Sequence, residues 1–175
     1  MEAPNHLRSA IRDIPDFPKP GILFRDITPI LADAGLYREA IAAFCRHCRA
    51  VGAERIAGID ARGFLFGATV AYEIGLGFVP VRKKGKLPFS TLSQSYDLEY
   101  GSSEIEIHTD AFRPGEKVAL IDDLLATGGT AGAAIRLIHS AGAQVVLAAF
   151  LIELAALGGR QALGSVPTEA LVIYP

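Results

Sequence analysis

The chain has 175 residues, 50% of them apolar and 18 of them glycine, and its 17 basic and 19 acidic side chains leave a net charge of −2. A chain of this length buries about 70% of its unfolded surface, so it can form one domain with its own core. The near-neutral charge excludes a general attraction to nucleic acid or to anionic membranes, and any anion site must therefore be local.

Neither an export signal nor a membrane span is predicted. Residues 1–15 lack the apolar segment of a signal peptide, and the apolar run at residues 145–152 is too short to cross a bilayer. We therefore expect a cytoplasmic protein without a membrane partner.

Cys45 and Cys48 form a C-x-x-C inside an amphipathic helical pattern. Since no second ligand pair accompanies them, we expect buried thiols rather than a zinc site.

The first part of the chain is predicted to form an arm. Residues 4–13 have a helical pattern, whereas Pro15, Pro18 and Pro20 favour an extended, irregular path that cannot join the interior of a sheet. Apolar residues that include Phe17 and Phe24 follow or interrupt these prolines. Composition alone favours an arm packed on the core, and the alternative is a hood over a flat aromatic ligand.

A strand, a tight turn and a helix follow the helix predicted at residues 36–51. Arg55–Ile59 reads as a short strand, residues 60–63 as the turn and the residues up to Ile74 as the helix. The guanidinium of Arg62 and the N–H groups of residues 61–63 could bind an anion together. The alternative is a surface arginine beside a glycine.

A dense basic cluster at residues 82–86 follows the strand predicted at residues 78–81. Four cations at the carboxyl end of a strand suit a polyanion such as pyrophosphate, although most charge runs are simply solvated. Residues 87–108 alternate around Gly101 and Ser102, which predicts an antiparallel hairpin. Its first part, residues 88–95, is predicted to be an irregular, mobile loop. Glu99 has the pattern of an ordinary exposed strand acid.

The stretch VALIDDLLATGGTAGAA at residues 118–134 is predicted to join a buried strand to a helix through a phosphate-binding turn. The apolar run at residues 118–121 is typical of a parallel strand, and Asp122 and Asp123 follow it at the edge where open sheets bind ligands. Two glycines and two threonines in residues 126–130 can present N–H and hydroxyl groups to one anion at the start of the helix. Carboxylates beside a phosphate site suit a ribose 5-phosphate, and the alternative is a turn with two solvated aspartates. The chain has neither a P-loop nor a dinucleotide fingerprint.

Strands are further predicted at residues 144–152 and 168–174. The order of elements predicts an α/β fold with a twisted, mainly parallel five-stranded sheet flanked by helices, a flexible hairpin and the N-terminal segment. We expect one domain over residues 1–175, with the N-terminal segment at about 1–34 and the core at about 35–175. The mobile loop and hairpin occupy residues 84–108 of that core.

Five motifs resemble those of the type I phosphoribosyltransferases, and among these the adenine phosphoribosyltransferase family: PDFPKPGILFRDITP, GIDARGFLFG, RKKGKLP, YDLEYG and VALIDDLLATGGT. The resemblance covers nearly the whole chain. It implies purine salvage, in which adenine and 5-phosphoribosyl-1-pyrophosphate (PRPP) give AMP and pyrophosphate. It also implies a homodimer and Mg²⁺ that is held by substrate oxygens and water rather than directly by the protein.

The resemblance further implies a role for each motif. The 5-phosphate and ribose of PRPP are assigned to Asp122, Asp123, Ala126, Thr127, Gly128, Gly129 and Thr130. The pyrophosphate is assigned to Ala61, Arg62, Gly63, Arg82, Lys83 and Lys86. Adenine is assigned to the ring of Phe24 in the N-terminal hood and to backbone groups of Leu23 and Arg25. Catalysis is assigned to Glu99 as general acid/base and to Tyr100 beside it.

Two alternatives remain at this level. A phosphoribosyltransferase for 6-oxopurines is disfavoured because the predicted hood offers Phe24 rather than a lysine-bearing loop. A non-catalytic nucleotide-sensing regulator is disfavoured because the sequence has no basic face or helix-turn-helix extension. Phe89 departs from the family pattern, since a polar or basic residue is expected there in the mobile loop.

Overall fold

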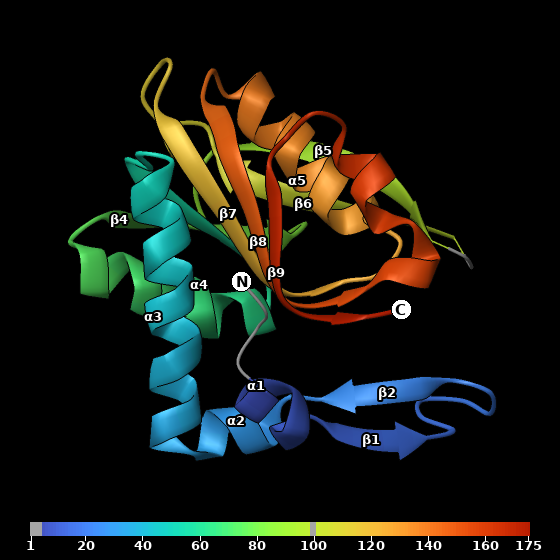
Figure 1. Cartoon of the computed structure of the whole chain (residues 1–175). Helices are drawn as coiled ribbons and strands as arrows, with labels where there is room; N and C mark the ends of the chain where they lie inside the picture. The colour runs from blue at the N-terminus through green and yellow to red at the C-terminus, as the bar shows by residue number, and fades with distance from the viewer. Residues whose placement is uncertain (1–4, 99–100) are drawn as a thin grey trace.

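A computed structural model describes residues 5–98 and 101–175, and within these ranges its main sheet has seven strands. They are β3 (Arg55–Ile59), β4 (Gly77–Lys83), β5 (Thr91–Leu98), β6 (Gly101–His108), β7 (Lys117–Leu125), β8 (Gln144–Leu154) and β9 (Thr168–Tyr174). Their order is β5-β6-β4-β3-β7-β8-β9. The last five strands in this order run parallel, whereas the β5–β6 hairpin adds to β4 in antiparallel fashion. The predicted α/β fold with a mainly parallel sheet is confirmed (Figure 1).

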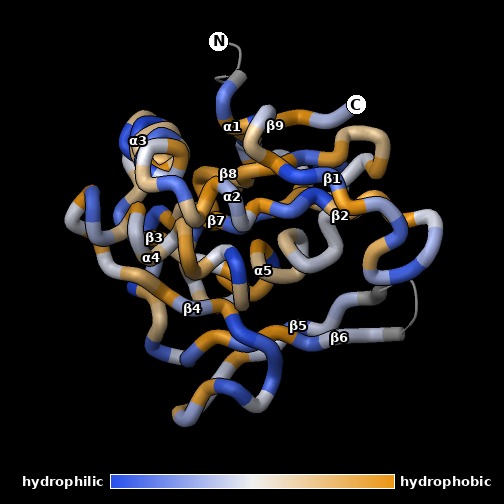
Figure 2. The backbone as a smooth tube through the Cα atoms, turned by 90° about the horizontal axis from the view of Figure 1, so that it is seen from below, coloured by the Kyte–Doolittle hydropathy of each residue, from blue (hydrophilic) through white to orange (hydrophobic). Residues whose placement is uncertain are grey.

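Helices cover both faces of this sheet. The helices α3 (Ala34–Ala50) and α4 (Arg62–Ile74) lie on one face, and α5 (Gly129–Ser140) lies on the other (Figure 1). Successive residues of a strand point to opposite faces, so β7 serves both layers. Ala119 and Ile121 pack in the cluster of α3 and α4, whereas Val118 and Leu120 pack in the cluster of α5. Figure 2 shows the apolar segments gathered around β7, β8 and α5.

Helix α3 begins at a side-chain cap and carries the two cysteines into the core. Asp33 accepts hydrogen bonds from the N–H groups of Gly35 and Leu36, at 2.8 and 2.9 Å. Cys45 and Cys48 are buried and free, which confirms the prediction of buried thiols. Burial raises the pKa of Cys48 to about 12, so its thiol stays protonated.

Among the described helices, none combines the length and the apolar character needed to cross a bilayer.

The N-terminal segment is more regular than the sequence predicts. It contains α1 (Asn5–Ala10), β1 (Arg12–Pro15), β2 (Leu23–Asp26) and α2 (Thr28–Ala32). The prediction of an irregular path is wrong at both ends, because β1 and β2 pair as a two-stranded antiparallel ribbon. Such a ribbon has only edge strands, which tolerate a terminal proline, and the other two prolines lie in the connection. The segment lies beyond the carboxyl ends of the parallel strands (Figure 1).

The core also differs from the sequence prediction in the extent of β7 and in the hairpin. Strand β7 continues to Leu125, because Leu124 and Leu125 still pair with β8. Asp122 and Asp123 therefore lie inside the strand rather than after it. The irregular loop predicted at residues 88–95 is wrong for Thr91–Ser95, which pair with β6. The hairpin belongs to the same sheet as the five parallel strands, through the pair Arg82 and Glu106.

The contact between α3 and α4 yields a stability prediction. Phe44 is fully buried on α3, and its ring centroid lies 5.7 Å from that of Phe66 on α4. Phe44→Ala should lower the free energy of unfolding by about 3 to 5 kcal/mol, because it leaves a cavity between the helices. Phe44→Leu, which keeps most of the volume, should cost much less in urea denaturation. Equal losses for the two variants would contradict this packing.

Candidate active site

The phosphate-binding turn predicted at residues 126–130 leads directly into α5. The helix begins at Gly129, and Gly128 caps it with φ of 79°, a left-handed conformation that glycine adopts without strain. The N–H groups of the first helical turn have no partner within the helix, so they are available to an anion. Thr127 is exposed and Thr130 is half-buried. The turn thus has the geometry of a phosphate site.

A second segment, η2 (Gly159–Leu163), supports this turn from behind. A side chain on Gly128 would lie 2.3 Å from the carbonyl oxygen of Gly159, and one on Gly159 would lie 2.3 Å from that of Ala126. Arg160 fixes the segment, since its Nε and Nη2 donate to the two carboxylate oxygens of buried Glu153 at 2.7 and 2.6 Å. Sequence reasoning missed this support, although the Gly158-Gly159 pair was a signal of close backbone approach.

The two acids of β7 lie against the start of α4. A side chain on Gly63 would come within 2.8 Å of Asp122 Oδ1, so the helix and the strand touch through backbone. Asp123 donates its N–H to the same oxygen at 2.9 Å. Burial, reinforced by the adjacent Asp123 carboxylate, raises the pKa of Asp122 well above its ordinary value. Asp122 therefore holds its proton to higher pH than a solvated aspartate.

Arg62 joins three parts of the predicted site. Its Nε lies 2.5 Å from Asp123 Oδ2. Its guanidinium carbon lies 5.9 Å from the centroid of the Phe24 ring. The side chains assigned by resemblance to pyrophosphate, ribose and adenine thus meet at the carboxyl ends of the strands.

The basic cluster at residues 82–86 is held next to the turn of Arg62. Arg82 Nε donates to Asp60 Oδ2 at 3.1 Å, and Asp60 immediately precedes that turn. Lys84 is engaged by Glu104 at 2.7 Å. Lys83 and Lys86 are exposed, and their side chains have no hydrogen-bond partner within residues 5–98 and 101–175. Two cations therefore remain available to an anion.

The predicted hood is fixed by contacts that leave its Phe24 near Arg62. Arg25 forms an ion pair with Asp13, and its guanidinium stacks 3.8 Å from the ring centroid of Tyr174 on β9. Arg8 donates to the carbonyl oxygen of Ile173, at 3.0 Å. Phe24 lies edge-on to Phe17, with ring centroids 5.1 Å apart. The side chain of Arg25 is thus used for docking the hood.

Two other features were singled out in the sequence. Glu99 and Tyr100, assigned to catalysis, lie outside the described residues. Phe89, which departs from the family pattern, is 61% exposed and lies edge-on to His108 at 6.1 Å.

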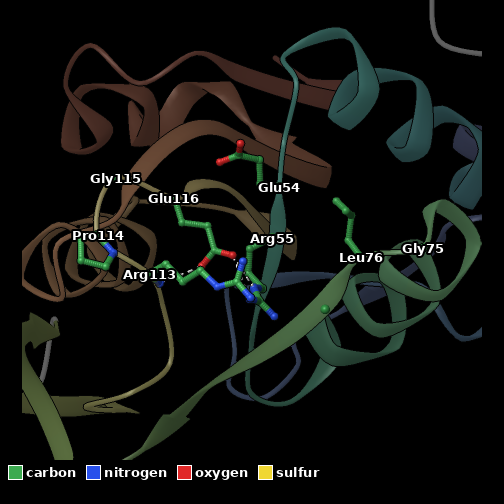
Figure 3. Close-up of a pocket in the computed structure, with 9 residues that line it drawn as sticks. Glu54, Arg55, Gly75, Leu76, Arg113, Pro114, Gly115 and Glu116 are labelled. Atoms are coloured by element: carbon green, nitrogen blue, oxygen red, sulfur yellow. Dashed lines mark hydrogen bonds and ion pairs between the residues drawn. The ribbon is translucent and has the colours of Figure 1, made fainter.

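A pocket of about 530 Å³ lies at the other end of the parallel strands, next to the amino ends of β3 and β7 (Figure 3). Its charged lining is largely neutralised internally, because Arg55 donates twice to Glu116 Oε1 at 2.8 and 3.0 Å. Glu116 Oε2 also accepts the N–H of Arg113 at 3.0 Å. These contacts fix the turn into β7, and none of the predicted site residues lines the pocket.

Sequence comparison identifies relatives of the chain. The family model described as "Phosphoribosyl transferase domain" matches residues 43–162. The adenine phosphoribosyltransferase of Neorhizobium galegae is 54% identical over 163 residues, which cover 93% of this chain and 90% of that protein. The chain belongs to the phosphoribosyltransferase family.

Solved structures of other phosphoribosyltransferases have the same fold. The adenine phosphoribosyltransferase of Thermoanaerobacter pseudethanolicus aligns with a TM-score of 0.94 at 48% identity, covering 97% of this chain and 99% of that one. The enzyme of Saccharomyces cerevisiae, complexed with D-2,5-dideoxy-2,5-imino-altritol 1,6-bisphosphate and adenine, aligns with a TM-score of 0.92 at 42% identity, covering 95% and 97%.

The raised pKa of Asp122 in this phosphoribosyltransferase gives a pH-dependence prediction. An acid that titrates higher in the folded than in the unfolded chain lowers stability as pH rises from about 4 through its folded pKa. Asp122→Asn removes this titration and keeps an oxygen for the N–H of Asp123. The variant should therefore be at least as stable as the original chain near neutral pH, with the advantage vanishing toward about pH 4, when melting temperatures are compared. A variant that is less stable throughout would contradict the assignment.

Proposed function

We propose that the chain transfers the 5-phosphoribosyl group of PRPP to adenine, giving AMP and pyrophosphate in purine salvage. The observation that carries the proposal is the meeting of Phe24, Arg62 and Asp123 at one edge of the sheet. It is supported by relatives that are named adenine phosphoribosyltransferase at 54% identity and by a 42% identical structure that contains adenine.

Asp122, Asp123 and the turn at residues 126–130 bind the ribose 5-phosphate. The amides at the start of α5 and the hydroxyls of Thr127 and Thr130 donate to the phosphate. Asp123 accepts from the ribose hydroxyls, which requires that Arg62 release it. The guanidinium of Arg62 then binds the pyrophosphate. PRPP therefore replaces the ion pair between Arg62 and Asp123 with one contact to each of these side chains.

The pyrophosphate lies between the turn at residues 61–63 and the basic cluster. The N–H groups of the turn and the side chains of Arg62, Arg82, Lys83 and Lys86 offset its charge. As the bond from ribose C1 to the pyrophosphate oxygen breaks, positive charge develops on the sugar and negative charge on the leaving group. Cations fixed beside the leaving group stabilise that separation more than the ground state.

Adenine lies under the hood, where Phe24 stacks on the purine and backbone groups of Leu23 and Arg25 read its edge. N9 forms the new bond to C1, and a proton must leave the purine. Glu99, with Tyr100 beside it, accepts or exchanges that proton. The hood ribbon and the hairpin that carries Glu99 thus act on the same base.

Mg²⁺ is the proposed cofactor, and the donor set fits a metal bound mainly through substrate. Within the described ranges, no group of three or more His, Cys, Asp or Glu side chains is arranged to hold an ion. The oxygens of PRPP and water would complete the octahedral shell that Mg²⁺ prefers. When bound, the metal neutralises part of the pyrophosphate charge.

The remaining proposals concern organisation. Residues 1–34 act as the hood and residues 35–175 as the core of one phosphoribosyltransferase domain, with the mobile loop and hairpin at residues 84–108. The enzyme is proposed to be a cytoplasmic homodimer whose partners are adenine and PRPP. These features are supported by the family resemblance of the motifs.

A purine panel tests the reaction. With PRPP and Mg²⁺, adenine should be converted to AMP, while hypoxanthine and guanine react with kcat/KM at least about 100-fold lower, since a site that reads a 6-amino group leaves polar groups unpaired with a 6-oxo group. The opposite order would indicate a 6-oxopurine enzyme. Tight nucleotide binding without turnover of any purine would indicate a regulator.

The proposed role of Glu99 predicts a selective loss of chemistry. Glu99→Gln keeps the size of the side chain but removes its charge, so the single-turnover rate should fall by about 10² to 10⁴. PRPP affinity and melting temperature should stay unchanged. Glu104→Gln, a second acid of the same hairpin, is the matched control and should retain the rate. A Glu99→Gln variant with undiminished chemistry would return Glu99 to the role of a hairpin residue.

A further inference from the structure

Glu106 is a buried acid next to the cations proposed to bind pyrophosphate. It is 3% exposed on β6 and lies directly opposite Arg82 of β4. A carboxylate in this position repels an incoming anion and loses its hydration. Its neighbours in the strand, Ile105 and Ile107, point to the opposite face of the sheet and pack in the apolar core. The burial of Glu106 is therefore accompanied by polar contacts rather than by apolar packing.

Its hydrogen bonds go to the backbone of the basic cluster. Glu106 Oε1 accepts the N–H of Lys86 at 2.9 Å and the N–H of Leu87 at 3.0 Å. From the other side, Arg82 Nη1 donates to the carbonyl oxygen of Lys86 at 3.1 Å. The peptide groups of Lys86 are thus held on both sides by a cross-strand pair, while its ammonium group remains exposed.

The same pair reaches the second anion-binding turn. Arg82 Nε donates to Asp60 Oδ2, at 3.1 Å, and Asp60 leads into the turn that carries Arg62. Fixing Arg82 and Lys86 relative to each other therefore also fixes the cluster relative to residues 61–63. Donors that are fixed before the charge develops need no reorganisation during the reaction.

We infer that Glu106 is a positioning residue for pyrophosphate: it holds the backbone of Lys86 so that the cluster and the Arg62 turn bind one anion together. The inference rests on the proposed function, in which Lys86 binds pyrophosphate. Glu106 itself touches no substrate. Its removal should affect ligands that carry pyrophosphate and spare those that lack it.

Three substitutions separate charge from geometry. Glu106→Ala removes the acceptor, and Glu106→Asp keeps the charge but withdraws the oxygen from the two N–H groups. Glu106→Gln loses the charge but keeps an oxygen that can accept both. Glu104→Ala is the matched control, since Glu104 lies on the same strand and bonds the side chains of Lys84 and Ser93 instead. Lys86→Ala tests the underlying assignment.

Calorimetry with pyrophosphate and with AMP, which lacks it, supplies the readout. Glu106→Ala and Glu106→Asp should weaken pyrophosphate binding roughly tenfold or more, the scale of lost hydrogen bonds to a charged group. Their AMP affinity, together with both affinities of Glu104→Ala, should stay within about twofold of the original chain, and Glu106→Gln, which keeps the acceptor and loses the repelling charge, should bind pyrophosphate at least as tightly as the original chain. In steady-state assays, KM for PRPP should rise while KM for adenine does not.

The outcomes are distinguishable. If Lys86→Ala leaves pyrophosphate affinity unchanged, the pyrophosphate assignment fails and this inference fails with it. If Lys86→Ala weakens binding but Glu106→Asp does not, only the inference is overturned. Equal losses for AMP and pyrophosphate would also overturn it, because they indicate general damage to the fold. If Glu106→Ala does not fold, the contrast between the Asp and Gln variants decides.

Discussion

The close approach of α4 to β7 is the constraint on which the site depends. A side chain at Gly63 would collide with both Asp122 Oδ1 and the carbonyl oxygen of Ile121, each at 2.8 Å, so the first turn of α4 can touch the strand only through glycine. This contact brings Arg62 beside Asp123 and, with the hood docked on β9, under Phe24. The turn proposed to bind pyrophosphate and the acids proposed to bind ribose are therefore neighbours in the structure.

Arginine–carboxylate pairs join several neighbouring segments of the described residues. At the carboxyl ends of the parallel strands, Arg62 with Asp123 joins α4 to β7 and Arg82 with Asp60 joins β4 to the turn before α4, while Arg160 with Glu153 joins η2 to β8. Partly buried pairs of this kind add little net stability, because desolvation offsets their attraction, but they penalise alternative geometries. The first of these pairs differs in one respect, since both Arg62 and Asp123 are proposed to bind the substrate itself.

The sequence predicted correctly those strands whose limits are marked by the residues within and directly beside them. The strands at Arg55–Ile59 and Thr168–Tyr174 begin and end as predicted, because each is a short apolar or alternating run between polar or turn residues. The ribbon of the hood was missed because its pairing joins residues across a proline-rich connection. The roles of Glu106 and Gly159 depend on backbone groups about 20 to 30 positions earlier in the chain, a distance at which spacing in the sequence carries no information. Glu99 and Tyr100 stay predictions from resemblance.

The docking of the hood on β9 has a consequence for the order of folding. Arg8 and Ile173 are 165 positions apart, and Arg25 stacks on the neighbouring Tyr174. During synthesis the ribbon emerges early, yet the surface that orients it is among the last parts of the described chain to leave the ribosome. Contacts of such sequence separation form slowly, because a long loop must close first. The turn proposed to bind phosphate can thus form in a nascent chain before these contacts with β9 fix the orientation of Phe24, the ring proposed to stack on the base.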